Sequence, residues 1–181
     1  MQTVPDVVAD PGRLDAVRRF LILHGGPNPV LDRLTGLAAQ LLEAPVALLT
    51  LVDRDRQYVL SAYGVSTAVA PTGLEYSICK HAVTSRRPLL VGDAQQLDLL
   101  RGHAAVIEYG VTAYAGMPLV TREGHAVGTL CVIDMVGRDW TGDQLVALSH
   151  LADIAMEAML ALVDGRGDEE WQAVASRFWQ S

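Results

Sequence analysis

Residues 76–83 read Tyr-Ser-Ile-Cys-Lys-His-Ala-Val and place Cys79, one of two cysteines in the chain, two positions before His81. A thiol and an imidazole in contact can form a nucleophilic pair, and both groups are ligands for zinc. If Ser77 caps a helix that starts here, Cys79 and His81 lie on opposite sides of it, because residues two apart on a helix do not face each other. The spacing therefore predicts a packed, buried Cys79 and neither a metal site nor a thiol–imidazole pair.

The second cysteine, Cys131, lies in the apolar run Gly-Thr-Leu-Cys-Val-Ile-Asp. In a strand, Thr129, Cys131 and Ile133 share one face, so packing is again the expected role. A disulfide with Cys79 requires Cα atoms within about 7 Å, which the sequence does not settle, and in a reducing compartment such a bond would be regulatory. Oxidation of Cys79 and Cys131 stays open as a redox-sensor alternative.

Other ionisable residues lack the spacing that catalysis requires. Asp53 and Asp134 each end an apolar strand, where an aspartate usually binds the backbone amides of the following turn. The chain has no glycine-rich phosphate loop and no Gly-x-Ser-x-Gly elbow. No metal-ligand spacing such as His-Glu-x-x-His occurs among His24, His103, His125 and His150. We therefore expect no catalytic residue, no metal and no cofactor.

Hydrophobic periodicity predicts the elements that position these groups. We expect helices at 14–25, at 30–43, from Ser77 onward and from Thr141 to about Val163, and strands at 46–52, 57–63, 86–93, 112–120 and 125–134. The first two and the last two strands are separated by short polar turns, which favour antiparallel hairpins. The helix at 30–43 carries an apolar stripe of Leu31, Leu34, Leu37, Ala38, Leu41 and Leu42. Residues 94–110 are weakly patterned and read as broken helix and loop. This order of elements predicts an α+β fold with an antiparallel sheet.

Length and charge limit the classes of partner. A chain of 181 residues, half of them hydrophobic, is long enough for one domain with terminal extensions. The net charge of −7 repels nucleic acid and anionic membranes alike. No basic segment followed by a hydrophobic one opens the chain, and no uncharged run of about 20 apolar residues is evident. We therefore expect a cytoplasmic protein with free thiols, no nucleic acid partner and no membrane span.

The chain resembles the GAF domains found in bacterial histidine kinases, cyclic-diguanylate enzymes and related signalling proteins. The resemblance covers residues 13–163 and rests on blocks that occur in the same order as in those domains. They are RLDAVRRFLIL, LDRLTGLAAQLLEAPVALLTLVDRDRQYV, SICKHAV, PLLVGDA, YAGMPLVTREGHAVGTLCVID and the helix after Asp139-Trp140-Thr141. It implies a GAF-like central sheet of five or six antiparallel strands, with the first and last helices on one face and pocket-covering helices and loops on the other. Residues 1–12 then form an N-terminal extension, and 164–181 form a tail that suits a short amphipathic helix.

The resemblance also indicates where a ligand would bind. It implies a pocket whose lid begins near Asp93, which makes a polar contact from Asp93 to a ligand one alternative. Tyr76 and Tyr114 are candidates to line the pocket with their rings, and Cys79 is expected near its floor. Core packing is the alternative role of both tyrosines. The lid segment, residues 97–110, departs from the family pattern, because LDLLRGHAAVIEYG lacks the usual aromatic and asparagine.

The last predicted helix carries two apolar stripes. One consists of Leu145, Leu148, Ala152, Ala155, Met159 and Leu162, and the other of Ala147, Leu151, Ile154, Ala158 and Ala161. One stripe can pack on the sheet. The other is covered either by a second copy, in a homodimer through 143–163, or by the first two helices of the same chain.

Taken together, these features predict a non-catalytic sensory or regulatory module of bacterial signal transduction, including two-component systems. It would bind a small molecule or a protein partner such as a signalling kinase, and would transmit the change through its terminal helices. The alternatives are the redox sensor and a GAF-fold enzyme, such as a free methionine sulfoxide reductase. That enzyme would need cysteines gathered at the pocket, and the lid segment contains none.

Overall fold

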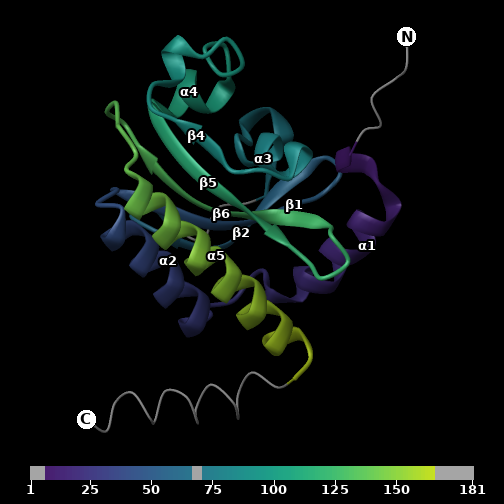
Figure 1. The fold of residues 1–181 in the computed structure, drawn as a ribbon. Helices are drawn as coiled ribbons and strands as arrows, with labels where there is room; N and C mark the ends of the chain where they lie inside the picture. Colours follow the sequence, from purple (N-terminus) through teal and green to yellow (C-terminus); the bar gives the residue numbers. More distant parts are fainter. Residues whose placement is uncertain (1–6, 67–70, 166–181) are drawn as a thin grey trace, which may run out of the picture.

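The computed structural model describes residues 7–66 and 71–165, which form an antiparallel sheet with helices on both faces (Figure 1). The helices are α1 (Pro11–Phe20), α2 (Pro29–Leu41), α3 (Cys79–Ser85), α4 (Ala104–Tyr109) and α5 (Gly142–Val163). The strands are β1 (Val46–Val52), β2 (Arg56–Tyr63), β3 (Thr72–Gly73), β4 (Leu89–Val91), β5 (Ala113–Val120) and β6 (Ala126–Asp134). Short 3-10 turns occur at Val7–Ala9, Leu21–Leu23, Leu74–Tyr76 and Ala94–Gln96.

The six strands lie in the order β3-β2-β1-β6-β5-β4, and each neighbouring pair is antiparallel. Strands β1 and β2 form one of the predicted hairpins, and β5 and β6 form the other. The predicted α+β fold is therefore confirmed. The two-residue strand β3 was not predicted, since so short a segment has no periodicity of its own.

Alternation along the strands separates two apolar clusters. In β1, Leu49 and Leu51 belong to the larger cluster, and Leu48 and Val52 belong to the smaller one on the opposite face. Because neither face of β1 is exposed to water, the whole strand can be apolar, as its sequence VALLTLV is. The central position of β1 between β2 and β6 agrees with this burial.

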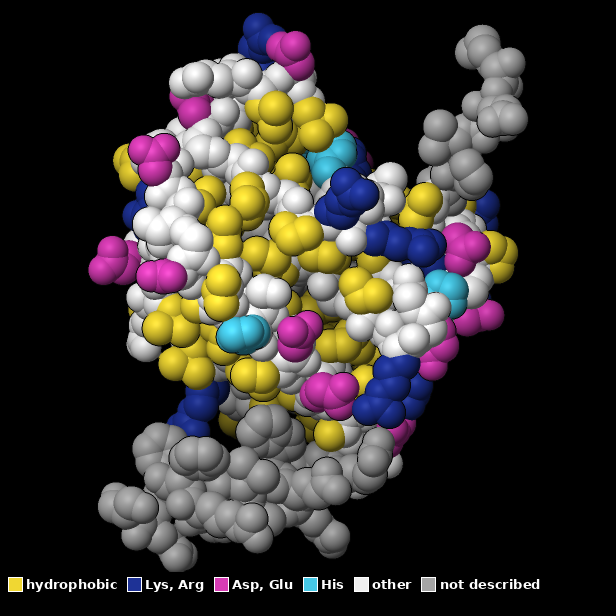
Figure 2. Space-filling view, in the orientation of Figure 1, with side chains coloured by type: hydrophobic (Ala, Val, Ile, Leu, Met, Phe, Trp, Pro, Cys, Tyr) yellow, Lys and Arg dark blue, Asp and Glu magenta, His cyan; other side chains and the backbone are white. Residues whose placement is uncertain are grey.

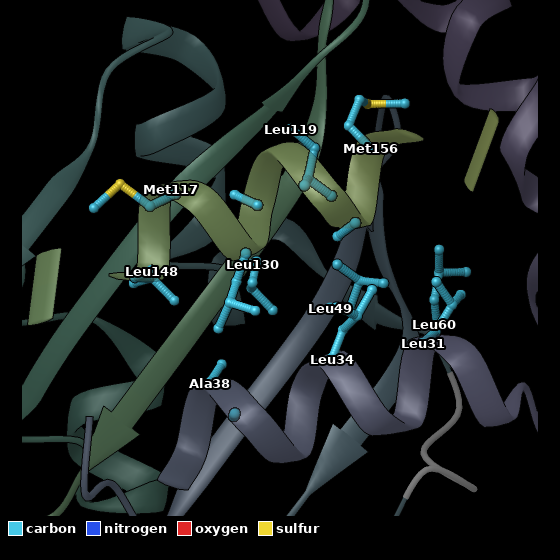
Figure 3. Close-up of a cluster of buried hydrophobic side chains, with 14 of the residues drawn as sticks. Leu31, Leu34, Ala38, Leu49, Leu60, Met117, Leu119, Leu130, Leu148 and Met156 are labelled. Carbon is cyan, nitrogen blue, oxygen red and sulfur yellow. The ribbon is translucent and has the colours of Figure 1, made fainter. Parts of the chain in front are cut away.

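The larger cluster lies between the sheet and the two helices α2 and α5, which run side by side in Figure 1. In Figure 3, Leu130 and Leu49 of the sheet lie between Leu34 and Ala38 of α2 and the apolar side of α5. Each leucine buried in this way contributes about 1.5–3 kcal/mol of transfer free energy. This layer is the main core of the fold.

Helix α2 corrects one detail of the predicted stripe. Asn28 caps the helix through a hydrogen bond from the Leu31 backbone N–H, and Pro29 is its first residue. Leu34 and Ala38 are buried, but Leu37 and Leu41 are 39% and 52% exposed. Leu37 is about 100° around the helix from the buried Ala38, and Leu41 about 100° from the buried Leu42, so one flat sheet cannot bury the whole stripe.

Helix α5 has the predicted start and end. Thr141 and Gln144 form the capping box, and the helix runs unbroken to Val163. Its length and composition alone would also suit a membrane span, with a mean hydropathy of 1.7, but core helices pass the same test. Here α5 places Leu148, Ala155 and Met159 in the main core.

The second stripe of α5 is partly covered within the chain. Leu151 and Ala158 are buried in the same cluster as residues of α1 and α2, whereas Ile154 is 44% exposed. Ala147 and Ala161 are half-buried, so the chain itself covers this stripe only in part. The predicted homodimer is not tested by this packing, and an interface on α5 would have to use the remaining exposed side.

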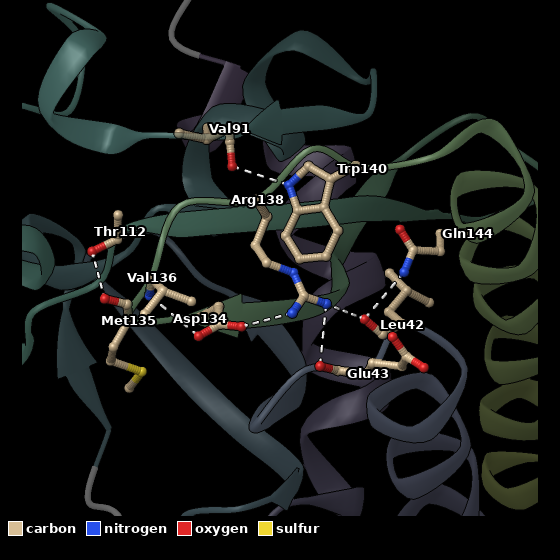
Figure 4. A network of polar contacts seen from close by, with 10 residues as sticks. All are labelled: Leu42, Glu43, Val91, Thr112, Asp134, Met135, Val136, Arg138, Trp140 and Gln144. Atoms are coloured by element: carbon tan, nitrogen blue, oxygen red, sulfur yellow. Dashed lines mark hydrogen bonds and ion pairs between the residues drawn. The ribbon is translucent and has the colours of Figure 1, made fainter.

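A polar network holds the loop before α5 against the end of α2 (Figure 4). The Arg138 guanidinium donates to the Leu42 and Glu43 carbonyl oxygens and pairs with Asp134 at 3.1 Å. It also lies 5.2 Å from the ring centroid of Trp140, whose indole N–H donates to the Val91 carbonyl oxygen. These partners lie just after α2, in β4 and in β6. The network therefore joins segments that are distant in the sequence.

One buried arginine of α1 joins the turn Val7–Ala9 to the end of β1. Asp10 caps α1, which begins three residues before the predicted start at Leu14. Arg13 is 1% exposed and donates to the carbonyl oxygens of Val52 and Val8, each at 2.6 Å. The predicted amphipathic helix of the C-terminal tail, with Trp171, Val174, Phe178 and Trp179, lies outside the described residues.

Candidate functional site

A cavity of about 330 Å³ lies on the sheet face opposite to α2 and α5, beneath α3 and α4. Its walls come from the five strands β1, β2, β3, β5 and β6, from α3 and α4, and from the segments next to β2, β3, β5 and β6. The lining residues are Val46, Leu48, Gln57, Val59, Val65, Ser66, Thr72, Tyr76, Ile78, Cys79, Ala105, Tyr109, Val111, Tyr114, Ile133 and Met135. Val65, Tyr109 and Met135 are also exposed at the surface, so the cavity reaches solvent beside them.

The wall is largely apolar. None of the described residues that line it is an Asp, Glu, Lys, Arg or His. Several of its polar atoms are already engaged within the protein: the Ser77 hydroxyl donates to the Gln57 side-chain carbonyl oxygen, and the Tyr76 hydroxyl donates to Glu108. An ion would lose its hydration here without a counter-charge, so the cavity suits an uncharged molecule.

Tyr114 fills the inner part of the site because its neighbour on the same face is a glycine. A Cβ atom at Gly116 would lie 2.3 Å from the Tyr114 hydroxyl oxygen, so the ring occupies space that any side chain at Gly116 would claim. The hydroxyl group is buried and donates to the Sγ atom of Cys79 at 3.4 Å. Tyr114 thus orients the thiol rather than presenting its proton to the cavity.

The two cysteines meet at this point. The Sγ atoms of Cys79 on α3 and Cys131 on β6 are 3.9 Å apart, and both residues are buried. The hydrogen bond with Cys131, together with smaller contributions from the hydroxyls of Thr129, Tyr114 and Thr50, lowers the pKa of Cys79 to about 6, against the opposing effect of burial. The same hydrogen bond, burial and the charge on Cys79 raise the pKa of Cys131. Cys79 is therefore the more acidic thiol of the pair.

Of the residues named from the sequence, Tyr76, Cys79 and Tyr114 line the cavity. Asp93 does not: its carboxylate accepts hydrogen bonds from the Gln95 backbone N–H and the Gln96 side chain, and caps the turn Ala94–Gln96. The geometry gives no support to a ligand contact from Asp93. Cys131 lies behind Cys79, in contact with it but outside the lining.

Sequence reasoning missed the side chains that line the cavity from distant segments. Gln57 at the start of β2 and Tyr109 at the end of α4 were not singled out, although both line it. Tyr109 lies in the predicted lid segment, and its ring centroid is 5.7 Å from that of Tyr76. Gln57 is a polar residue at the start of an apolar strand, and this was the sequence signal that could have identified it. The structure buries it.

The separation of Cys79 from His81 is confirmed. Ser77 accepts a hydrogen bond from the Lys80 backbone N–H, as a cap would, although the helical conformation already begins at Ile78. His81 points to the other side and packs against His103, with ring centroids 6.0 Å apart. Burial, followed by the positive charges of Lys80 and His103, lowers the pKa of His81 to about 4. The imidazole is therefore neutral at physiological pH.

The acidic residues at the strand ends serve the turns, as predicted. The Asp53 carboxylate accepts from the Arg54 backbone N–H, and Asp134 accepts from the Val136 backbone N–H and from Arg138. Because β1 and β6 are antiparallel, the two aspartates lie at opposite ends of the pair and cannot act as an acid–base couple. Within residues 7–66 and 71–165, no three His, Cys, Asp or Glu side chains are grouped to hold a metal ion.

Comparison with known proteins places this arrangement in a family. The GAF domain model matches residues 27–159, which is more than half of the chain. The chain belongs to the GAF domain family. The predicted family is thus confirmed, and a GAF domain is a sensory and regulatory fold.

One relative is a cyclic di-GMP phosphodiesterase of Pseudomonas aeruginosa, which is 30% identical to this GAF chain over 158 residues. The match covers 86% of this chain but only 27% of that protein, so the chain spans about a quarter of its relative. The shared segment is therefore one part of a longer signalling enzyme.

Solved structures show the same fold at low identity. The GAF domain of an Acinetobacter phosphoenolpyruvate-protein phosphotransferase has a TM-score of 0.62 and 15% identity, and the match covers 88% of this chain and 98% of that one. A type II free methionine-R-sulfoxide reductase of Thermoplasma acidophilum also has a TM-score of 0.62, at 10% identity, covering 80% of this chain and 96% of that one. One of these neighbours is an enzyme, so the likeness establishes the fold without deciding between regulation and catalysis.

Proposed function

We propose that this GAF domain is a non-catalytic sensory module that binds a compact, uncharged and largely apolar molecule in the cavity beneath α3 and α4. The observation that carries the proposal is the cavity of about 330 Å³, whose described lining residues are largely apolar and include no Asp, Glu, Lys, Arg or His. Its volume lies at the lower end of the range for small-molecule sites, about 300–1,000 Å³. A polar group at its wall, the Tyr109 hydroxyl, would orient the ligand.

The same wall disfavours the enzymatic alternative. A free methionine sulfoxide carries an ammonium and a carboxylate group, and a buried site for it would need partners for both charges. Of the described lining residues, none supplies such a partner. The phosphates of a cyclic dinucleotide would meet the same difficulty, and the net charge of −7 would add long-range repulsion.

The signal would leave through the helices on the opposite face. The relative from Pseudomonas contains this domain as about a quarter of its length, which supports a role beside a separate output domain or a partner such as a signalling kinase. A homodimer through 143–163 would use the exposed side of α5, with Val146 and Ile154 at 55% and 44% exposure. Figure 2 views the molecule from the side on which α5 lies, and hydrophobic side chains are spread across this face among polar ones.

Free thiols suit the reducing cytoplasm of a bacterium, which is the location we propose.

The test is native mass spectrometry of the protein purified from its own host, followed by denaturation and identification of the released molecule. A defined, uncharged species in wild type would support the proposal. It should be absent from Ala105→Phe, which fills the cavity from α4, and retained in Ile107→Phe, because Ile107 is 67% exposed on the same helix. Equal occupancy in both variants, or an empty wild-type protein, would contradict binding in this cavity.

A further inference from the structure

The two cysteines are arranged asymmetrically with respect to the cavity. Cys79 contributes to the wall, whereas Cys131 is fully buried behind it and lies outside the described lining. Their Sγ atoms are 3.9 Å apart. A molecule that enters the cavity therefore meets one sulfur first, and the second sulfur is already within reach of the first.

The surroundings of the pair also differ between the two sulfurs. Cys79 accepts a hydrogen bond from the Tyr114 hydroxyl and is hydrogen-bonded to Cys131, and both interactions lower the pKa of Cys79 and so favour its thiolate form. The proton of the pair is thereby held mainly on Cys131. A reaction that begins at the Cys79 thiolate and is completed by attack of Cys131 requires this distribution of the proton between the two sulfurs.

We propose that Cys79 and Cys131 form an oxidation site at the inner end of the cavity, where a small uncharged hydroperoxide converts the two thiols to a disulfide. The hydroperoxide class follows from the cavity, because its largely apolar wall, without Asp, Glu, Lys, Arg or His, admits a neutral oxidant, and its size excludes a bulky one. The site needs no regulatory ligand, so it stands or fails independently of the sensory function proposed above.

The oxidation proceeds in two steps, with the hydroperoxide as the two-electron oxidant. The Cys79 thiolate attacks the terminal oxygen of the hydroperoxide, the O–O bond breaks, and the alkoxide or hydroxide that leaves takes a proton from the Cys131 thiol. Cys79 is then a sulfenic acid and Cys131 a thiolate. The Cys131 thiolate attacks the Cys79 Sγ atom, the S–S bond forms, and the hydroxide that leaves is protonated to water. Two thiols and one hydroperoxide thus give a disulfide, an alcohol or water, and one further water.

Formation of this bond would change the cavity itself. A disulfide has an S–S distance of about 2.0 Å, so the sulfur atoms must approach by about 1.9 Å from their present 3.9 Å. Cys79 is the first residue of α3, and Cys131 is held in the centre of the sheet by β1 and β5. The movement therefore falls mainly on α3, which withdraws a wall residue from the cavity.

The experiment treats the full, reduced chain with hydrogen peroxide at pH 7, then alkylates the free thiols and measures the intact mass and the linked peptides. We expect an intramolecular Cys79–Cys131 disulfide, reversed by dithiothreitol. In Cys131→Ala, dimedone should trap a sulfenic acid at Cys79, and in Cys79→Ala the oxidation of Cys131 should be at least tenfold slower. Disulfide formation should be slower in Ala105→Phe than in wild type, and in Ile107→Phe it should be as fast as in wild type.

Two results would overturn the proposal. One is equal reactivity of Cys79 and Cys131 in the folded wild-type protein, read at the peptide level so that no variant has to fold. The other is oxidation in the folded state that is no faster than in the same chain unfolded in urea, since the arrangement of the site would then contribute nothing. An empty cavity in native mass spectrometry would contradict the sensory proposal alone.

Discussion

The ring of Tyr114 lies over Gly116, two residues along the same strand, and a methyl group on Gly116 would come within 2.6 Å of its ring carbons. This contact decides where the Tyr114 hydroxyl points and hence how it reaches Cys79. The absence of one side chain on β5 is thus a condition for the polar inner end of the cavity.

We therefore predict that Gly116→Ala destabilises the protein by about 1–3 kcal/mol, because the buried ring has to move in a filled core. Urea unfolding followed by circular dichroism measures this change. The matched control is Gly26→Ala, where an added Cβ meets nothing within 4 Å, and its effect should be within about 1 kcal/mol. Equal effects of the two substitutions would contradict the contact.

The apolar stripe of α2 offers a second prediction. Leu34→Ala should cost about 2–4 kcal/mol, because Leu34 is 6% exposed in the core between α2 and α5. Leu41→Ala should cost less than about 1 kcal/mol, because Leu41 is 52% exposed. Unfolding in urea distinguishes them, and a loss at Leu41 as large as that at Leu34 would mean that another surface covers Leu41 in solution.

The Arg138 network offers a third prediction. Arg138→Met should destabilise the fold by about 2–3 kcal/mol, because it leaves the carbonyl oxygens of Leu42 and Glu43 and the mostly buried Asp134 without this donor. Arg122→Met is the control: Arg122 and Glu157 form a pair at 3.4 Å with both side chains exposed, and its loss should cost less than about 0.5 kcal/mol. Thermal unfolding at constant pH compares the two, and similar shifts in Tm would contradict the role of the network.

His81 predicts a dependence of stability on pH. Its pKa is lowered to about 4 in the folded state from an ordinary value of 6.5, so the unfolded chain binds more protons between these values. The contribution of His81 is complete above about pH 6.5 and is lost as the pH falls towards 4. In wild type, the free energy of unfolding should therefore decrease as the pH is lowered from 6.5 to 4.

The matched comparison is His81→Gln against His150→Gln, because His150 is exposed on α5. His81→Gln should flatten the slope between pH 6.5 and 4.5, above the range in which most carboxyl groups titrate. His150→Gln should leave the slope as it is in wild type. A slope that is unchanged in His81→Gln would show that other groups produce it.

Much of the fold could be predicted from the chain itself, because the signals are local. The hairpin at 46–63 follows from two apolar runs around a polar turn, and the start of α5 follows from Thr141 and Gln144. The opposite orientation of Cys79 and His81 follows from helical geometry alone. Each of these features involves residues that are close in sequence, so periodicity and capping are sufficient to specify them.

The candidate site could be predicted only in part. Tyr76, Cys79 and Tyr114 were identified, but Gln57 and Tyr109 were not. The cavity lies between segments whose relative placement depends on the strand order β2-β1-β6-β5 and on the helices above it. Asp93 illustrates the converse, because its place after a strand suited a ligand contact, whereas the fold uses its carboxylate to cap a turn.

The sequence by itself determined the hairpins, the capping box of α5, the family and the burial of both cysteines, since these depend on residue type and short-range spacing. Only the tertiary structure decided that Cys79 and Cys131 meet, that Leu37 and Leu41 are exposed, and that the cavity wall is largely apolar. The physical reason is that contacts between remote side chains depend on how a helix lies across a sheet. That geometry is set by the packing of the whole core, and no local pattern contains it.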